Sequence, residues 1–232
     1  MMNVRGILLD LDNTLYCYNL AHDLALKKTF DEIIVKFNID REFVFKAFNK
    51  AKIRTKTMLP ISAAGHDRLL YFQNMFEILK INPLLFSYEA SEIYWNHFFK
   101  NMLLTEDSLI FLKKTQKIPI CLVTDLTASI QFRKIKRLKL DDRITSIVTS
   151  EEVGVEKPHP FPFLYGIKKL GCRLDEVIMI GDSLENDILG ATSLGIKSFL
   201  INRNSHQDDK IKKNGSEHYT VNLLTEIEID RL

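Results

Sequence analysis

Residues 7–14 read Ile-Leu-Leu-Asp-Leu-Asp-Asn-Thr, and this stretch does most to decide the fold. The apolar run is typical of a buried strand, and it ends in two carboxylates, Asp10 and Asp12, followed by turn-forming residues. Side chains two positions apart share one face of an extended chain, so both carboxylates can approach the same phosphate or cation. Taken alone, the pattern fits a capped helix start without chemistry equally well, because Asp, Asn and Thr are also good N-cap residues.

Three further places in the chain supply polar groups of complementary kind, after an apolar run or in a loop. In chain order these groups are Thr124 with Asp125, then Lys157, then Asp182 with Asp187. Ligands bind at the carboxyl ends of the strands in an open α/β sheet. The order Asp-x-Asp, Thr, Lys-Pro, Gly-Asp-x-x-x-x-Asp is hard to obtain by accident, and it indicates one site at one edge of a sheet.

Alternating strand and helix patterns predict the fold class. Strands are expected over residues 5–9, 118–123, 144–148, 177–180 and 197–201, with helical patterns between them. This alternation predicts an α/β fold with a doubly wound parallel sheet. The segment between residues 18 and 100 has no convincing strand pattern. Its four amphipathic segments predict a helical bundle, with helices over residues 21–37, 41–56, 63–80 and 83–99.

The motifs resemble those of the haloacid dehalogenase superfamily, whose hydrolases use an aspartate nucleophile. The resemblance covers nearly the whole chain. Residues 124–195 match the superfamily closely, 150–158 above all, whereas the segment between Tyr16 and about Asn101 matches only in position and helical character. The family resemblance is therefore specific in the motifs and general in the helical segment.

The resemblance implies two domains. Residues 1–17 and 102–232 would form a Rossmann-like catalytic core, and residues 18–101 would form a helical-bundle cap inserted after the nucleophile loop. In one large branch of the superfamily such a cap closes over the active site and excludes water. Closure of this kind often sets both specificity and turnover.

The resemblance also implies a role for each matching residue. Asp10 would be the nucleophile that attacks phosphorus to give an aspartyl-phosphate, and Asp12 would be the general acid and base. Thr124 would hold the phosphoryl oxygens, together with backbone amides around Asp125. Lys157 would neutralise both the nucleophile and the phosphate.

Magnesium is the implied cofactor. Asp182, Asp10 and the carbonyl of Asp12 would bind Mg²⁺, and Asp187 would support the metal site through water. Oxygen ligands suit magnesium, which prefers few carboxylates and a substrate phosphate. A phosphomonoester dianion repels a carboxylate nucleophile, so a divalent cation and a lysine must offset its charge.

Alternatives without chemistry exist for each residue taken singly. Lys157 can be a solvated loop lysine, Thr124 a helix cap, and Asp182 a turn residue. These alternatives must hold at every place together, which favours the site. One departure bears on the phosphate loop: many relatives place Asn-Gly after the threonine, whereas here Asp125 and Leu126 follow.

Asp12 distinguishes chemistries within the superfamily. Dehalogenases lack an aspartate there, because a halide needs no proton to leave, and the phosphonate-cleaving branch departs there too. The predicted function is a Mg²⁺-dependent phosphatase of a small phosphorylated metabolite, with sugar phosphates, phosphoglycolate-like acids and nucleoside monophosphates as candidates. The alternatives are a sugar phosphomutase and a non-catalytic, phosphate-binding regulatory module.

Substrate choice is expected to lie in the cap. His66 or Arg68 can contact a carboxylate or sugar there, but the favoured interpretation is a helix start in which Asp67 faces the helix dipole and the two basic residues face solvent. The aromatic residues of the cap, Phe43 and Phe45 among them, are expected to pack the bundle.

Composition bounds the remaining possibilities. The 232 residues are 46% hydrophobic, which is enough for a sizeable core, and 32 basic against 30 acidic residues leave a net charge of +2. This balance argues against nucleic acid or a membrane as a partner, and the basic clusters 133–137 and 210–213 are expected to be solvated. Three widely spaced cysteines and the lack of an apolar stretch near the roughly 20 residues of a membrane span favour a cytoplasmic protein. The oligomeric state stays open.

Overall fold

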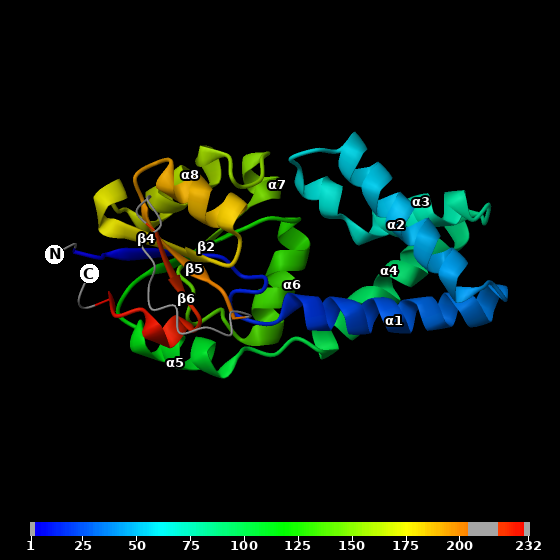
Figure 1. Cartoon of the computed structure of the whole chain (residues 1–232), viewed down its shortest axis with the longest axis horizontal. Helices are drawn as coiled ribbons and strands as arrows, with labels where there is room; N and C mark the ends of the chain where they lie inside the picture. Colours follow the sequence, from blue (N-terminus) through cyan, green and yellow to red (C-terminus); the bar gives the residue numbers. More distant parts are fainter. Residues whose placement is uncertain (1–2, 204–217, 230–232) are drawn as a thin grey trace. The chain divides into compact units, whose positions relative to one another are not determined.

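The computed structural model describes residues 3–203 and 218–229, and the chain divides into two compact units (Figure 1). The core unit comprises residues 1–17 and 103–232, and the helical unit comprises residues 18–102. Among the described residues, no helix is both long and apolar enough to cross a bilayer. The basic cluster 210–213 lies outside the described residues.

The core unit contains a six-stranded parallel sheet with the strand order β3-β2-β1-β4-β5-β6. The strands are β1 (Gly6–Leu9), β2 (Ile120–Thr124), β3 (Ser146–Thr149), β4 (Val177–Gly181), β5 (Lys197–Ile201) and β6 (His218–Val221). The predicted α/β class and doubly wound parallel sheet are confirmed, and the five expected strands occur within two residues of their predicted bounds. Strand β6 was not predicted, because this four-residue edge strand leaves Tyr219 and Thr220 only half-buried and has no long apolar run.

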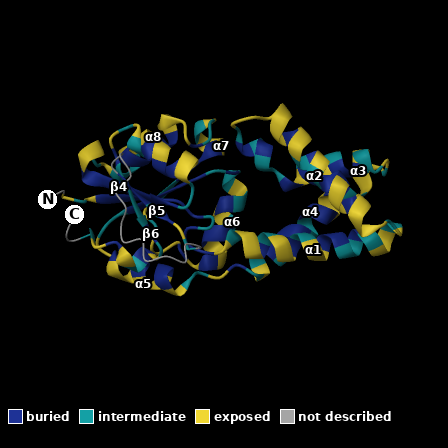
Figure 2. Ribbon diagram, viewed as in Figure 1, coloured by how far each residue is buried: buried dark blue, intermediate teal, exposed yellow. Residues whose placement is uncertain are grey.

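Helices cover both faces of this sheet, so its central strands are buried throughout. In Figure 1, α8 (Pro160–Leu170) and α5 (Glu106–Lys114) lie on opposite sides of the strands. Figure 2 shows the strands as mainly buried and the outer helix faces as exposed. On the α8 side, Leu8, Cys121, Val123 and Met179 join one apolar cluster.

Close packing of α8 depends on a small residue. A Cβ atom at Gly166 would lie 2.9 Å from Leu8 Cδ2 and 3.2 Å from Val123 Cγ2, so a larger residue would push the helix off the sheet. The core unit also contains α6 (Ala128–Leu138), α7 (Ser150–Val153), α9 (Gly190–Thr192), the π-helix Leu184–Leu189 and the short 3₁₀ turns Leu174–Glu176 and Leu224–Glu226.

The helical unit consists of α1 (Tyr18–Phe37), α2 (Arg41–Met58), α3 (Arg68–Ile78) and α4 (Pro83–Lys100), with a 3₁₀ turn over Ala63–His66. Three of these helices begin after side-chain caps: Asp40, Asp67 and Asn82 each accept a hydrogen bond from a backbone N–H of the first turn. The expected helix over 63–80 therefore begins five residues late, because Asp67 ends the 3₁₀ turn and caps α3.

Aromatic side chains fill the interior of this unit. The rings packed there include those of Phe30, Phe48, Tyr71, Phe72, Phe76, Tyr94, Trp95 and Phe98. Phe43 and Phe45 are exceptions at 60% and 54% exposure, so the expectation that they pack the bundle is wrong. Both lie on the exposed side of α2, whose buried stripe is formed by Val44, Ala47, Phe48 and Ala51.

Arg68 is buried within the helical unit, which corrects the expectation that it faces solvent. The residue is 5% exposed. Its guanidinium donates hydrogen bonds to the Tyr18 hydroxyl and to the His66 carbonyl. The guanidinium carbon also lies 5.3 Å from the Tyr71 ring centroid and 5.4 Å from that of Tyr94. Aromatic faces attract a guanidinium, and this attraction draws the first side chain of α3 inward.

Candidate active site

The sheet order brings the sequence motifs to one edge. In the register of the sheet, Leu9 lies between Leu122 of β2 and Ile180 of β4, and the Asp10 amide still donates a 2.9 Å hydrogen bond to the Ile180 carbonyl. Asp10, Thr124 and Asp182 therefore emerge from three neighbouring strands at their carboxyl ends. This is where an open α/β sheet binds its ligands.

Asp10 is held from both sides. Its Oδ1 accepts a 2.8 Å hydrogen bond from Lys157 Nζ, and its Oδ2 accepts a 2.9 Å hydrogen bond from the Thr14 hydroxyl. The turn of residues 10–17 precedes α1, which begins only at Tyr18, so the helix-start alternative for this motif is wrong. Thr14 is a site residue that the motif reasoning treated only as a turn former.

Lys157 is a buried residue, so the solvated-loop alternative is also wrong. It is 5% exposed, and its Nζ contacts Asp187 Oδ1 at 2.5 Å and the Val123 carbonyl at 2.8 Å, in addition to Asp10. Burial alone lowers the pKa of this lysine, but the negative charges of Asp10 and Asp187 outweigh burial and keep the pKa well above its ordinary range. The ammonium is thus permanently charged beside the proposed nucleophile.

Three carboxylates gather next to this lysine. One oxygen from each of Asp10, Asp182 and Asp187 lies within 4.8 Å of the others. Burial raises the pKa of Asp10 to about 6, with Lys157 opposing the shift. Burial and the charge of Asp10 raise the pKa of Asp182 to about 7. One lysine does not cancel the repulsion among these three carboxylates. A divalent cation bound by their oxygens would relieve it.

Asp187 is tied down by both of its oxygens. Oδ1 contacts Lys157, and Oδ2 accepts a 3.0 Å hydrogen bond from the Ser183 amide. The space that this carboxylate occupies exists because residue 181 is glycine: a Cβ atom there would lie 2.3 Å from Asp187 Oδ2. Gly181 is therefore required for steric reasons.

The loop that is predicted to bind phosphate, called the phosphate loop below, is built by β2 and α6. Thr124 is the last residue of β2, whereas Thr127 precedes the first turn of α6, so the helix-cap alternative for Thr124 is wrong. The Gln131 side-chain amide donates 2.7 Å hydrogen bonds to the Thr124 hydroxyl and to the Asp125 carbonyl, which fixes the loop. Sequence reasoning missed Gln131.

Asp125 turns its carboxylate toward the backbone. Its Oδ1 accepts a 3.1 Å hydrogen bond from the Lys157 amide. Burial raises the pKa of Asp125 to about 6, and Lys157 opposes the shift. The departure from Asn-Gly at this position is therefore accommodated by a hydrogen bond that joins the phosphate loop to the lysine loop.

Asp12 contacts a second lysine, Lys134, which belongs to the basic cluster 133–137 that is expected to be solvated. Lys134 Nζ lies 2.8 Å from Asp12 Oδ1 and 2.5 Å from Oδ2, and the Tyr16 hydroxyl also donates to Oδ1. The lysine side chain is 0% exposed, so the expectation for residues 133–137 is wrong at this residue.

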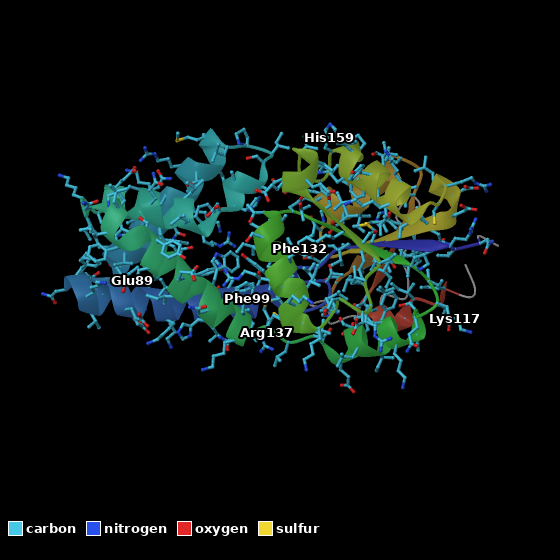
Figure 3. All side chains as sticks on the ribbon, turned by 180° about the vertical axis from the view of Figure 1, so that it is seen from behind. Glu89, Phe99, Lys117, Phe132, Arg137 and His159 are labelled. Carbon is cyan, nitrogen blue, oxygen red and sulfur yellow. The ribbon has the colours of Figure 1, made fainter. Side chains whose placement is uncertain are left out.

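The helical periodicity of α6 carried the missing signal. Gln131, Lys134, Ile135 and Leu138 recur at the i, i+3, i+4, i+7 spacing of a buried face, and all four are buried. Phe132 and Arg137 of the same helix, labelled in Figure 3, are exposed.

Comparisons with known proteins identify the family of this chain. Residues 7–201 match the haloacid dehalogenase-like hydrolase family. The chain is 33% identical over 209 residues to the ribulose-1,5-bisphosphate 5-phosphatase of Halopiger xanaduensis, with 88% of this chain and 87% of the relative covered. It is 28% identical over 232 residues to the glyceraldehyde 3-phosphate phosphatase of Methanocaldococcus jannaschii, with 97% and 95% covered.

Solved structures share the fold. The HAD (haloacid dehalogenase) phosphatase of Thermococcus onnurineus matches with a TM-score of 0.71 at 25% identity, over 96% of this chain and 95% of that one. A 2-haloacid dehalogenase from Pseudomonas syringae matches with a TM-score of 0.74 at 17% identity over 96% of both chains, which shows the fold alone. The predicted family is confirmed. The chain belongs to the haloacid dehalogenase-like hydrolase family and is a phosphatase, a hydrolase of phosphomonoesters.

Proposed function

We propose that the protein is a Mg²⁺-dependent phosphatase that hydrolyses a small phosphorylated metabolite through an aspartyl-phosphate on Asp10. The observation that carries this proposal is the arrangement at the sheet edge. A buried carboxylate, Asp10, is held by Lys157 and Thr14, and a second carboxylate, Asp12, follows two residues later with a quarter of its side chain exposed, at 26%.

The reaction has two steps in this proposal. In the first, an Asp10 oxygen attacks phosphorus, the bond from phosphorus to the ester oxygen breaks, and Asp12 gives its proton to the leaving alkoxide. In the second, Asp12 takes a proton from water as the water oxygen attacks phosphorus and the bond from phosphorus to Asp10 breaks. Lys157 and the amides after Thr124 offset the charge of the phosphoryl oxygens throughout.

The acidic cluster fits a magnesium ion. Asp10 and Asp182 would supply carboxylate ligands, the Asp12 carbonyl a third oxygen, and Asp187 would orient the site through the bonds it already makes to Lys157 and Ser183. When bound, the ion would reduce repulsion between the phosphate dianion and these carboxylates.

A phosphorylated sugar is the proposed substrate class. Two relatives that span most of the chain are named for phosphatase activity on ribulose 1,5-bisphosphate and on glyceraldehyde 3-phosphate. We propose that the helical unit of residues 18–102 acts as the cap that selects among such esters, because the chain inserts it directly after the turn that holds Asp10 and Asp12.

The test is phosphate release from a panel of phosphorylated sugars, phosphoglycolate and nucleoside monophosphates, with Mg²⁺ and with EDTA. Wild type is compared with Asp10→Asn and with Asp142→Asn, a matched change at an exposed aspartate of the core unit. Metal-dependent release by wild type and by Asp142→Asn, and none by Asp10→Asn, is the expected result.

Two outcomes would contradict the proposal in different ways. Turnover of a sugar phosphate only after priming with its bisphosphate, with the product retained as an isomer, would assign a phosphomutase. A folded wild type that binds a phosphate analogue but releases phosphate from no ester would assign a binding module.

A further inference from the structure

Lys134 contacts Asp12, the proposed general acid and base, from the interior of the protein. Its side chain is 0% exposed whereas that of Asp12 is 26% exposed, so the lysine approaches Asp12 from the protein side and leaves the other side of the carboxylate open. Both Asp12 oxygens lie within 2.8 Å of Lys134 Nζ. A contact to both oxygens restrains the rotation of the carboxylate about its Cβ–Cγ bond as well as its position.

Burying an ammonium is costly unless it is paired and well hydrogen-bonded, and the effective penalty is several kcal/mol per ion. Helix α6 nevertheless places Lys134 on its buried stripe, three residues after Gln131, which holds Thr124. One face of one helix therefore supports both the phosphate loop and Asp12. The cost of burying the Lys134 ammonium here is explained if the Asp12 carboxylate must keep one fixed orientation.

We propose that Lys134 is a positioning residue that orients Asp12 for proton transfer. The inference rests on the proposed function, because it needs Asp12 to act as acid and base. Oδ1 of Asp12 accepts hydrogen bonds from both Tyr16 and Lys134, whereas Oδ2 accepts only from Lys134 among the described residues. Oδ2 is thus the oxygen with a free lone pair, and it is the one that gives its proton to the leaving alkoxide and takes one from water.

The two buried lysines have separate duties in this arrangement. Lys157 contacts Asp10 and Asp187, and Lys134 contacts Asp12. Replacing Lys134 therefore leaves the nucleophile and its lysine in place. A variant without Lys134 should therefore have a selective defect. Steps that need proton transfer by Asp12 should slow down, whereas attack by Asp10 on an ester with a good leaving group should not.

The experiment compares first-turnover rates of Lys134→Met with those of wild type on two esters. One is an alkyl phosphate that wild type hydrolyses, whose alkoxide needs a proton to leave. The other is p-nitrophenyl phosphate, whose phenolate leaves without one. Tyr16→Phe is the second test variant, and Lys136→Met is the control, because Lys136 lies on the exposed face of the same helix and pairs with Asp141.

We expect Lys134→Met to slow the first turnover of the alkyl ester by ~100-fold or more, within the usual range of general acid catalysis, and that of the aryl ester by less than about 10-fold. The aryl ester should then show a burst of about one p-nitrophenolate per enzyme, because the second step also needs Asp12. Tyr16→Phe should give the same pattern with a smaller loss, since Lys134 still contacts both oxygens.

An equal loss on both esters, or no loss on either, would overturn the inference while wild type remained active. A wild type that hydrolyses neither ester would instead contradict the proposed function. Thermal unfolding of each variant separates these results from misfolding, and if Lys134→Met is unfolded, the leaving-group pattern of Lys134→Gln decides.

Discussion

The core unit and the helical unit each bury a cation, and they compensate its charge by different means. Lys157 of the core unit contacts the carboxylates of Asp10 and Asp187. Arg68 of the helical unit forms no ion pair among the described residues and is held by hydroxyl and carbonyl oxygens and by aromatic faces. The lysine and the carboxylates around it can each also interact with a charged ligand. Aromatic rings packed around an arginine form a rigid, strongly packed interior instead.

The largest expected effect comes from breaking the carboxylate arrangement. Lys157→Met leaves Asp10 and Asp187 buried and unpaired, so we expect a loss of about 3–5 kcal/mol in the free energy of unfolding and a fall in kcat of at least ~100-fold. Urea unfolding and phosphate release measure the two effects. Lys117→Met, at an exposed lysine labelled in Figure 3, is the matched control and should change neither. A stable, active Lys157→Met would show that the carboxylates do not depend on this lysine.

Arg68→Met tests the aromatic arrangement and should have a smaller effect. The variant loses two charge-assisted hydrogen bonds and the ring contacts but leaves no unpaired charge, so we expect a loss of roughly 2–3 kcal/mol in the free energy of unfolding. Arg68→Lys keeps the charge and loses the planar stacking. If Arg68→Lys is as stable as wild type, then charge alone matters and the proposed role of the rings is wrong.

His22 of the helical unit makes the stability of the protein depend on pH, because its side chain is largely buried near Arg68. Burial first, and then the charges of Arg68 and Lys52, lower the pKa of His22 from 6.5 to about 3, and its Nδ1 lies 2.6 Å from the Tyr94 hydroxyl while its ring stacks on Tyr18. The unfolded chain takes up a proton near pH 6.5 and the folded protein only near pH 3. The contribution of His22 to the free energy of unfolding is therefore fully present above pH 6.5 and declines as the pH falls toward 3.

This linkage predicts that about 2 kcal/mol of the free energy of unfolding is lost at His22 between pH 7 and pH 5. Urea unfolding at the two pH values, for wild type and for His22→Gln, isolates the contribution as the difference between the two proteins. An identical pH dependence in wild type and His22→Gln would contradict the shifted pKa.

The smallest effect is expected at the surface of the helical unit. Lys36 Nζ lies 2.6 Å from Glu89 Oε2 and 4.5 Å from the Phe86 ring centroid, and both charged side chains are about half exposed, at 43% and 53%. Glu89, labelled in Figure 3, can be changed to Gln with a loss of less than about 0.5 kcal/mol in the free energy of unfolding. A loss above 1 kcal/mol would mean that this exposed ion pair stabilises the helical unit more than a surface pair is expected to.

Much of the core unit was predictable because its signals are local. Each apolar run of β1, β2 and β4 ends in a polar group, and the parallel topology brings those ends together without further information. Two of the predictions that failed concern Lys134 and Arg68. Both are charged residues that general tendencies place at the surface, and each is buried because a partner far away in the sequence, Asp12 or Tyr18, meets it in the fold.

The sequence by itself therefore determined the α/β class, the family and the carboxylates that line the edge of the sheet, because strand periodicity and strand-end motifs depend on neighbours in the chain. Only the tertiary structure decided that a second lysine, Lys134, serves Asp12 and that Lys157 also contacts Asp187. Lys157 meets Asp10 across 147 positions and Lys134 meets Asp12 across 122. Such pairs form only when helices pack on the sheet and exclude water, since that burial makes an unpaired charge too costly to keep.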